Sequence, residues 1–247
     1  MWLIFNNELM KNLIRTIDPS IFTKVTYDRV IYDALTDNVI VTGGEEEEVE
    51  EVITYEYVDL GLPSGLKWAT TNVGAKTEEE YGHYYMWGST IPNTPDECNW
   101  ANAPFNNGAA SYDTTYFNSV KNDVVPNKVL AKEYDVAAQI MGGDWRMPTK
   151  DECQELYKNT TQSWVTINGV NGRKFTSKTD TTKYIFIPAA GYYYNGSVSE
   201  VGNNGYIWSS TISSPYNKVR FLKFKATTCS ASTTERCYGM SVRGVRI

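Results

Sequence analysis

Histidine and cysteine are scarce in this chain: its 247 residues include one histidine, His83, and four cysteines. Most zinc sites and most hydrolases with an activated nucleophile need a histidine, so we expect neither chemistry. The cysteines lack the spacing of metal ligands. Of these, Cys229 and Cys237 could close a loop through a disulfide, although we favour free thiols. We therefore expect no metal site and no cofactor.

Long apolar runs are also missing. No stretch approaches the roughly 20 apolar residues that a membrane-spanning helix requires. The apolar segment Trp2-Leu3-Ile4-Phe5 is too short for the core of a signal peptide, and no basic residue precedes it. Phosphate loops, dinucleotide fingerprints and nucleophile elbows are absent from the sequence as well. We expect no membrane span, no conventional secretion signal and no enzymatic activity.

Negative charge dominates the chain, but it is unevenly distributed. The formal net charge is −6, and six glutamates lie within residues 45–51. Residues 201–247 instead carry seven lysines and arginines against Glu235 alone, a balance of +6. Such a basic end suits an anionic partner, although ordinary solvated charges would explain it equally well. No nucleic-acid-binding motif accompanies it, so we do not expect a nucleic-acid partner.

Aromatic residues are abundant, with 18 tyrosines and seven tryptophans. The apolar runs are short and are interrupted by Gly, Asn and Pro, which favours a loop-rich fold dominated by strands. Strands are expected at 52–60 and 184–187, with hairpin turns at Asn168-Gly169 and Asn171-Gly172. The tyrosines at 192–194 could belong to the core or form the floor of a binding face.

Helix signals occur at three places. Thr77-Glu78-Glu79-Glu80 and Thr149-Lys150-Asp151-Glu152 both have the pattern of a capping box, and the second should open a helix through about Tyr157. Residues 128–140 form another candidate helix, ended by Gly142-Gly143. In the preceding Trp145-Arg146-Met147-Pro148-Thr149, we expect a structural role in which Arg146 pairs with a carboxylate. Two helices followed by many short strands predict the α+β class.

The N-terminal residues 1–44 are predicted to be a separate helix-hairpin unit. Its helix would include residues 9–14, and its hairpin would join a strand at 22–30 to one at 39–41 through Asp37-Asn38. So small a unit buries little surface alone, which suggests attachment or oligomerisation. Residues 45–51 would form an acidic linker, and the main domain would occupy 52–247.

The last stretch, residues 205–247, combines apolar anchors with a polar middle. Trp208 and the Leu222/Phe224 pair are predicted to be core, and Val242 and Val245 to form a closing strand. Residues 225–234 between them are rich in Ser and Thr and have little to bury, so we expect a displayed, solvated surface.

Several motifs in order resemble one known family. They are Leu62-Pro63-Ser64-Gly65-Leu66-Lys67-Trp68-Ala69-Thr70, Asn72-Val73-Gly74-Ala75, Glu80-Tyr81-Gly82, Met86-Trp87-Gly88, Trp145 to Thr149, Pro188-Ala189-Ala190-Gly191-Tyr192, Gly205 to Ser210 and Tyr238 to Arg243. Together they resemble the variable proteins of diversity-generating retroelements in gut Bacteroidetes and their phages. The resemblance covers about residues 55–247. It implies a C-type-lectin-like fold whose variable region, about 206–238, is rewritten by a dedicated reverse transcriptase.

The resemblance implies a ligand-binding or receptor-binding protein with a diversified surface, such as a phage tail adhesin. Its location would be the virion or the bacterial cell surface, its partner a protein or glycan there, and its assembly a homo-oligomer such as a trimer. Ile91-Pro92-Asn93 departs from the calcium-binding loop of true lectins, so no lectin-type calcium site is expected. The residues expected to be displayed are Ile207, Ile212, Tyr216, Val219, Phe221, Lys223, Thr227, Thr228, Ser230, Ser232, Arg236 and Tyr238.

Two alternatives remain open. The first is a fixed carbohydrate-binding or cell-surface adhesin module without active diversification. The second is an oxidase similar to formylglycine-generating enzymes, whose Arg-Leu-Pro-Thr segment resembles Arg146-Met147-Pro148-Thr149. Those enzymes need a reactive cysteine pair near the C-terminus, and only Cys229 and Cys237 could supply it.

Overall fold

The structure, a computed structural model, describes residues 2–4, 30–33, 38–41 and 54–247. The chain divides into two compact units, Met1–Val52 and Ile53–Ile247. In the first unit β1 (Trp2–Ile4), β2 (Val30–Asp33) and β3 (Asn38–Val41) form an antiparallel sheet in the order β1-β2-β3. The strand predicted at 39–41 is thus confirmed, but its partner is Val30–Asp33, which shares only Val30 with the predicted 22–30, and Asn38 belongs to β3 rather than to the turn. The predicted helix at 9–14, residues 22–29 of the predicted strand and the linker 45–51 lie outside the described residues.

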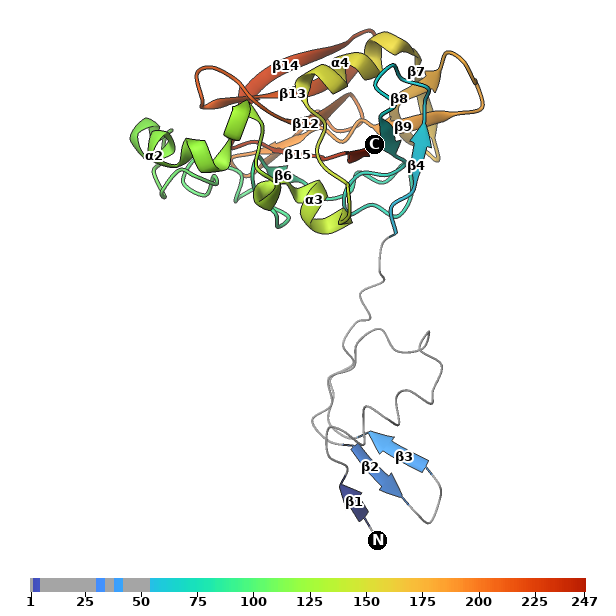
Figure 1. Cartoon of the computed structure of the whole chain (residues 1–247), viewed down its shortest axis with the longest axis vertical. Coiled ribbons are helices and arrows are strands. Elements are labelled where there is room, and N and C mark those ends of the chain that lie inside the picture. Colours follow the sequence, from blue (N-terminus) through green and yellow to red (C-terminus); the bar gives the residue numbers. More distant parts are fainter. Residues whose placement is uncertain (1, 5–29, 34–37, 42–53) are drawn as a thin grey trace. The chain divides into compact units, whose positions relative to one another are not determined.

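The second unit is α+β, as predicted, with four small antiparallel sheets (Figure 1). One sheet joins the two ends of the unit, because β5 (Lys67–Ala69) pairs with both β4 (Tyr57–Asp59) and β16 (Val245–Arg246). Val245 therefore belongs to a closing strand as predicted. By contrast, Val242 is buried outside any strand. The first strand is shorter than the predicted 52–60, since residues 54–56 have no strand structure.

The other three sheets form the body of the unit. Their orders are β7-β8-β9, β12-β13-β14 and β11-β10-β15-β6. The strands run as follows: β6 Tyr85–Met86, β7 Thr160–Ile167, β8 Val170–Ser177, β9 Tyr184–Pro188, β10 Tyr192–Tyr194, β11 Ser197–Ser199, β12 Asn204–Ile212, β13 Lys218–Lys225, β14 Cys229–Glu235 and β15 Gly239–Met240. The strand expected at 184–187 is confirmed as β9.

One predicted hairpin turn is confirmed and the other is wrong. Asn168 and Gly169 join β7 to β8 with φ angles of 48° and 84°, as a two-residue turn with left-handed backbone requires. Asn171 and Gly172 instead lie within β8. There the glycine allows close packing, because a Cβ atom on Gly172 would lie 2.5 Å from the carbonyl oxygen of Ile187.

Three α-helices are present in the described part of the chain: α2 (Thr114–Val124), α3 (Val136–Met141) and α4 (Lys150–Asn159). Helices α3 and α4 lie at two of the three places where helix signals were found, whereas α2 was not predicted. Only the end of the predicted 128–140 helix is α-helical, because the Asp135 side chain accepts hydrogen bonds from the N–H groups of Ala137 and Ala138 and starts a new helix there. Two short 3₁₀ turns, η2 (Pro126–Lys128) and η3 (Lys132–Tyr134), precede it.

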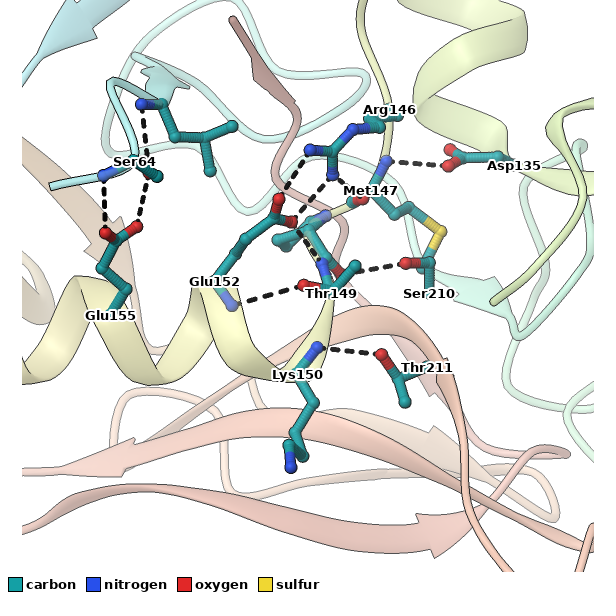
Figure 2. Close-up of polar contacts among 12 residues, drawn as sticks. Ser64, Asp135, Arg146, Met147, Thr149, Lys150, Glu152, Glu155, Ser210 and Thr211 are labelled. Atoms are coloured by element: carbon teal, nitrogen blue, oxygen red, sulfur yellow. Dashed lines mark hydrogen bonds and ion pairs between the residues drawn. The ribbon is translucent and has the colours of Figure 1, made fainter. Parts of the chain in front are cut away.

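The two predicted capping boxes behave differently. At α4 the box forms as expected, with the Thr149 side chain accepting from the Glu152 N–H and the Glu152 carboxylate accepting from the Thr149 N–H. Figure 2 shows the Arg146 guanidinium bound to the same carboxylate, with 2.6 Å between Nη2 and Oε1. No helix forms at Thr77–Glu80. There the chain folds back as a loop, held by the Asn72 side chain, which donates to the Tyr81 carbonyl.

The sheet β12-β13-β14 has a buried cluster on each face. Trp208, Val219 and Phe221 belong to one cluster, while Leu222 and Phe224 belong to the other. Successive residues of a strand point to opposite faces, so two buried faces require apolar side chains on both. The second cluster also contains residues of α4, which packs against β13 and β14. Trp208, Leu222 and Phe224 are therefore core, as predicted.

The Ser/Thr-rich segment is more ordered than predicted. Its residues 229–235 form β14, which pairs with β13 from Phe224↔Cys229 to Lys218↔Glu235 without a register shift. Hydrogen bonds between backbone groups form this ladder, so strand pairing does not depend on the small polar side chains of β14. Only residues 225–228 and Ser230 are exposed there, and the others are partly buried. The polar middle is therefore largely a strand, with a short turn before it.

Candidate ligand-binding surface

Five of the twelve residues expected to be displayed are buried: Ile207, Ile212, Val219, Phe221 and Arg236. The expectation of display is wrong for these five, because both faces of β12 and β13 are covered. Four of them are apolar residues of the two core clusters. The fifth, Arg236, has a 0% exposed side chain although it is a cation.

The other seven reach the surface but do not form one group. Tyr216 precedes β13 and packs against α2, with its ring 5.8 Å from that of Phe117. Thr227 and Thr228 lie at the opposite end of β13, in its turn to β14. The remaining four, Lys223, Ser230, Ser232 and Tyr238, are the best candidates for a common surface.

The register of the sheet brings three of those four together. Lys223 lies opposite Tyr206 on β12 and opposite Ser230 on β14. Phe221, two residues earlier on β13, lies opposite Ser232. Directly opposite residues of antiparallel strands point to the same face. Hence Lys223, Ser230 and Ser232 project from one face, the face turned away from α4.

Tyrosines from three parts of the chain continue this face. The Tyr192 ring of β10 lies 5.2 Å from Tyr206 and 5.4 Å from Tyr238, measured between centroids. Tyr194 stacks on Tyr238 at 4.3 Å, with 5° between the ring planes. All except Tyr206 are partly exposed. We call Tyr192, Tyr194, Tyr206, Tyr238, Lys223, Ser230 and Ser232 the tyrosine surface.

Charged groups border the tyrosine surface. The Tyr206 hydroxyl and the Asn204 side-chain amide both donate to Oε2 of Glu200. Burial opposes ionisation of Glu200, but these two hydrogen bonds outweigh it and lower its pKa. The Lys223 ammonium lies 5.1 Å from the centroid of the Tyr206 ring. Tyr206 therefore has a carboxylate at its hydroxyl and an ammonium over its ring.

Glu200 also has an uncommon backbone conformation. Its φ angle is 61°, in the left-handed region that costs energy for residues other than glycine. The neighbouring loop is tightly packed, since a Cβ atom on Gly191 would lie 2.1 Å from the Ser199 carbonyl oxygen. Sequence analysis did not identify Glu200 or Tyr206. Their roles can be recognised only when it is known which strands are neighbours in the sheets.

Arg236 holds the segment that carries Tyr238. Its guanidinium donates to the carbonyl oxygens of Pro104 and Phe105, and the carbon Cζ lies 4.7 Å from the Phe117 ring centroid. Burial lowers the pKa of Arg236 to about 10. Carbonyl oxygens and ring faces replace the water that an exposed arginine would have. The residue is therefore a structural tie between the 104–117 region and the end of β14.

The cysteines do not form the pair that the oxidase alternative needs. Cys229 packs with Cys153 in the cluster beneath α4, whereas Cys237 and Cys98 belong to a third cluster. All four are free thiols, which was favoured from the sequence for Cys229 and Cys237. Burial raises the pKa of both Cys229 and Cys237 to about 12. Thiols so far from ionisation are weak nucleophiles, which counts against this alternative.

The segment Trp145–Thr149 borders a cavity of about 300 Å³ lined largely by apolar groups. Its polar groups are used internally: the Asp135 carboxylate accepts from the Met147 N–H, and the Ser210 hydroxyl donates to the Pro148 carbonyl (Figure 2). Burial raises the pKa of Asp135. These contacts attach the start of α4 to β12, the structural role expected from the sequence.

Among the described residues no three His, Cys, Asp or Glu side chains are grouped as metal ligands. The helices of this part are also too short or too polar to cross a bilayer. Comparison of the chain with family models, with curated proteins and with solved structures gave no match.

Proposed function

We propose that the chain is a binding protein that uses the tyrosine surface to recognise a macromolecule on a bacterial surface. The observation that carries the proposal is the joining of three partly exposed tyrosines, two serines and one lysine around the buried ring of Tyr206 on a single face. Tyrosine provides large, rigid contact area at low entropic cost, and serine provides adaptable hydrogen bonding. Antibody binding sites rely on the same two residue types for these reasons.

A second observation supports variability of this surface. The Ser230 and Ser232 side chains make no hydrogen bond within residues 54–247, so replacing them would remove no polar contact of the fold. Their neighbours in the ladder, Phe221 and Leu222, are buried. Replaceable positions and buried positions are thus held on one rigid support, as a diversified binding site needs. This agrees with a variable region at about 206–238 on a C-type-lectin-like domain.

We further propose that the N-terminal unit joins copies of the chain into a homo-oligomer such as a trimer. Weak single contacts would then be combined into strong attachment. This arrangement suits an adhesin at a phage tail or on a bacterial cell, with a protein or glycan as its target.

A fixed carbohydrate-binding module remains the second candidate, because the stacked Tyr194 and Tyr238 rings could receive a sugar ring on an outer face. The two candidate functions can be distinguished by comparing the sequences of gene copies from different isolates. Under the first proposal they differ mainly within 206–238 and at exposed positions such as Ser230, Ser232 and Tyr238. Variation that falls equally on Ile207 and Phe221, or identical copies throughout, would contradict diversification.

A glycan array tests the second candidate directly. The intact protein is compared with one whose segment 206–238 comes from another gene copy. Unchanged glycan specificity after the exchange would favour a fixed site elsewhere on the domain. A changed specificity would place recognition in the exchanged segment.

A further inference from the structure

One end of the tyrosine surface lies beside an acidic residue, Glu235, the last residue of β14. The Tyr238 N–H donates to the Glu235 carbonyl across a tight turn, which keeps the two residues together. In the Glu235 carboxylate, Oε2 accepts from the Trp100 indole N–H at 3.3 Å. The other oxygen, Oε1, has no hydrogen-bond partner among residues 54–247. A partly exposed carboxylate therefore keeps a free acceptor next to the aromatic rings.

Two tyrosine hydroxyls near Glu235 also make no hydrogen bond within the described residues. They belong to Tyr192 and Tyr238, whose ring centroids are 5.4 Å apart. Burial is the largest cause that raises the pKa of Tyr238 to about 12, and the proximity of Tyr194, Glu235 and Tyr192 raises it further. These groups are thus within electrostatic range of Tyr238. Their oxygen atoms remain available to accept hydrogen bonds from a ligand.

The exposed charge around these oxygen atoms is mainly negative. Asp96 provides a second carboxylate, since a Cβ atom on Gly196, in the turn from β10 to β11, would lie 2.8 Å from its Oδ1. Of the cations nearby, Arg236 is 0% exposed and donates inward to carbonyl oxygens. Lys218 lies opposite Glu235 on β13. Within residues 54–247 no ion pair neutralises either carboxylate.

An arginine side chain matches both the charge and the rings. The Tyr194 and Tyr238 rings are parallel to within 5°, and both are partly exposed. A guanidinium is planar, stacks on aromatic faces and binds a carboxylate through two parallel N–H groups. The ammonium of lysine is a compact charge that cannot stack in this way. The combination of a parallel ring pair with a free carboxylate oxygen therefore favours arginine.

We propose that this end of the tyrosine surface binds an arginine side chain of a protein target. The guanidinium would stack on the Tyr194–Tyr238 pair and donate to Glu235 and to the hydroxyls of Tyr192 and Tyr238. The inference rests on the proposed function, because it takes the tyrosine surface as the binding site and names the chemistry of its target. An uncharged glycan would leave the carboxylates without a cation, so a protein is the favoured target.

The test uses the full chain and three capped peptides, Gly-Arg-Gly, Gly-citrulline-Gly and Gly-Lys-Gly. Citrulline has nearly the shape of arginine but no charge. Binding is followed by NMR through the ring signals of isotope-labelled tyrosines. We expect the arginine peptide to bind about tenfold more tightly than the citrulline peptide, and more tightly than the lysine peptide. Its advantage should shrink as salt is added, and the shifted signals should include Tyr194 and Tyr238.

A single substitution tests the carboxylate. Glu235→Gln removes the charge but keeps an oxygen that can accept from the Trp100 indole. It should weaken binding of the arginine peptide about tenfold and leave the citrulline peptide unaffected. Glu133→Gln, at an exposed glutamate of η3, is the matched control and should bind as the unaltered chain does. If Glu235→Gln does not fold, the comparison of the three peptides on the unaltered chain decides.

The proposal is overturned if the citrulline or lysine peptide binds as tightly as the arginine peptide. It is also overturned if a folded Glu235→Gln variant binds the arginine peptide normally, or if only tyrosines outside this end of the surface respond.

Cell adhesion by Tyr238→Ala tests the proposed function separately. Loss of adhesion without arginine binding in the unaltered chain would leave the tyrosine surface as a binding site and reject only its arginine target. Arginine binding with unchanged adhesion would keep the arginine site and reject the proposed function.

Discussion

Tyr194 and Tyr238 lie face to face, with 4.3 Å between ring centroids and 5° between ring planes, although one belongs to β10 and the other follows β14. Burial raises the pKa of Tyr238 to about 12, so its hydroxyl stays protonated across the physiological range. The pair fixes the place where the C-terminal segment meets the rest of the tyrosine surface.

Removing this stack should reduce binding more than stability. For Tyr238→Ala we expect a loss of about 2 kcal/mol or more in ligand affinity, because exposed aromatic anchors dominate interfaces. Tyr238→Phe keeps the ring and is the matched control. Adhesion to cells that bind the unaltered protein measures the effect. Equal adhesion by all three proteins would place the binding site elsewhere.

Exposed positions of the ladder should accept large changes that buried positions do not. Ser230→Tyr and Ser232→Tyr should change the free energy of unfolding by no more than about 0.5 kcal/mol, as surface substitutions usually do. Phe221→Ala, on the strand beside them, should cost about 3–5 kcal/mol. Urea denaturation measures all three. A large loss for either serine variant would show that the surface is not replaceable.

Arg236 should be needed for the 104–117 region to stay in place. In Arg236→Ala the carbonyl oxygens of Pro104 and Phe105 lose their donors, and we expect a loss of about 3 kcal/mol or more. Arg236→Lys keeps the charge, but lysine lacks the planar guanidinium that binds both oxygens. It should therefore restore little of the lost stability. Thermal denaturation measures stability, and hydrogen exchange should increase in residues 104–117. Full rescue by lysine would mean that charge alone matters.

Glu152 should make stability depend on pH in the acid range. Burial alone would raise its pKa, but hydrogen bonds from Arg146 and Thr149 outweigh burial and hold it below the ordinary 4.5. A carboxyl group whose pKa is lower in the folded protein than in the unfolded chain stabilises the fold at pH values above its unfolded pKa. That contribution is lost as the pH falls through its folded pKa. Glu152→Gln should therefore lose about 1–3 kcal/mol at pH 7 and show a flatter decline below pH 4.5.

The control for that experiment is Asp151→Asn. Asp151 is next to Glu152 but its side chain is 82% exposed, and within the described residues its only ion pair is with Lys150 at 3.0 Å. Exposed pairs of this kind contribute little to stability. Equal pH profiles for Glu152→Gln and the unaltered chain would contradict the prediction.

Local signals predicted the parts of the fold that depend on neighbouring residues. The capping box at Thr149 and the turn at Asn168-Gly169 need only a few consecutive residues, and both form as expected. The box at Thr77 has the same pattern but fails. There the chain forms a loop up to Gly82, whose φ angle is 69°, and the Asn72 side chain holds it at the Tyr81 carbonyl. Helix α2 was missed because only Phe117 and Val124 of its residues are buried, too few for a visible period.

The candidate site was harder to predict because it depends on pairing between distant strands. Tyr238 and Lys223 were identified from their place in the final segment, but Tyr206 gains its role only through its position opposite Lys223. Arg236 was mistaken for a surface residue, since nothing near it in sequence indicates that the carbonyl oxygens of Pro104 and Phe105 will surround it. Arginine is seldom fully buried, so the residue type also favoured an exposed position, which is wrong here.

The two-sided burial of β13 has a genetic consequence. Phe221 and Leu222 are buried on opposite faces, while Lys223 beside them reaches the surface. A process that rewrote neighbouring codons without distinction would therefore damage the core about as often as it altered the surface. Useful variation requires codons for the buried positions that the mutating chemistry does not recognise. If the segment is diversified as proposed, its nucleotide sequence should thus distinguish the codons of buried positions from those of exposed positions.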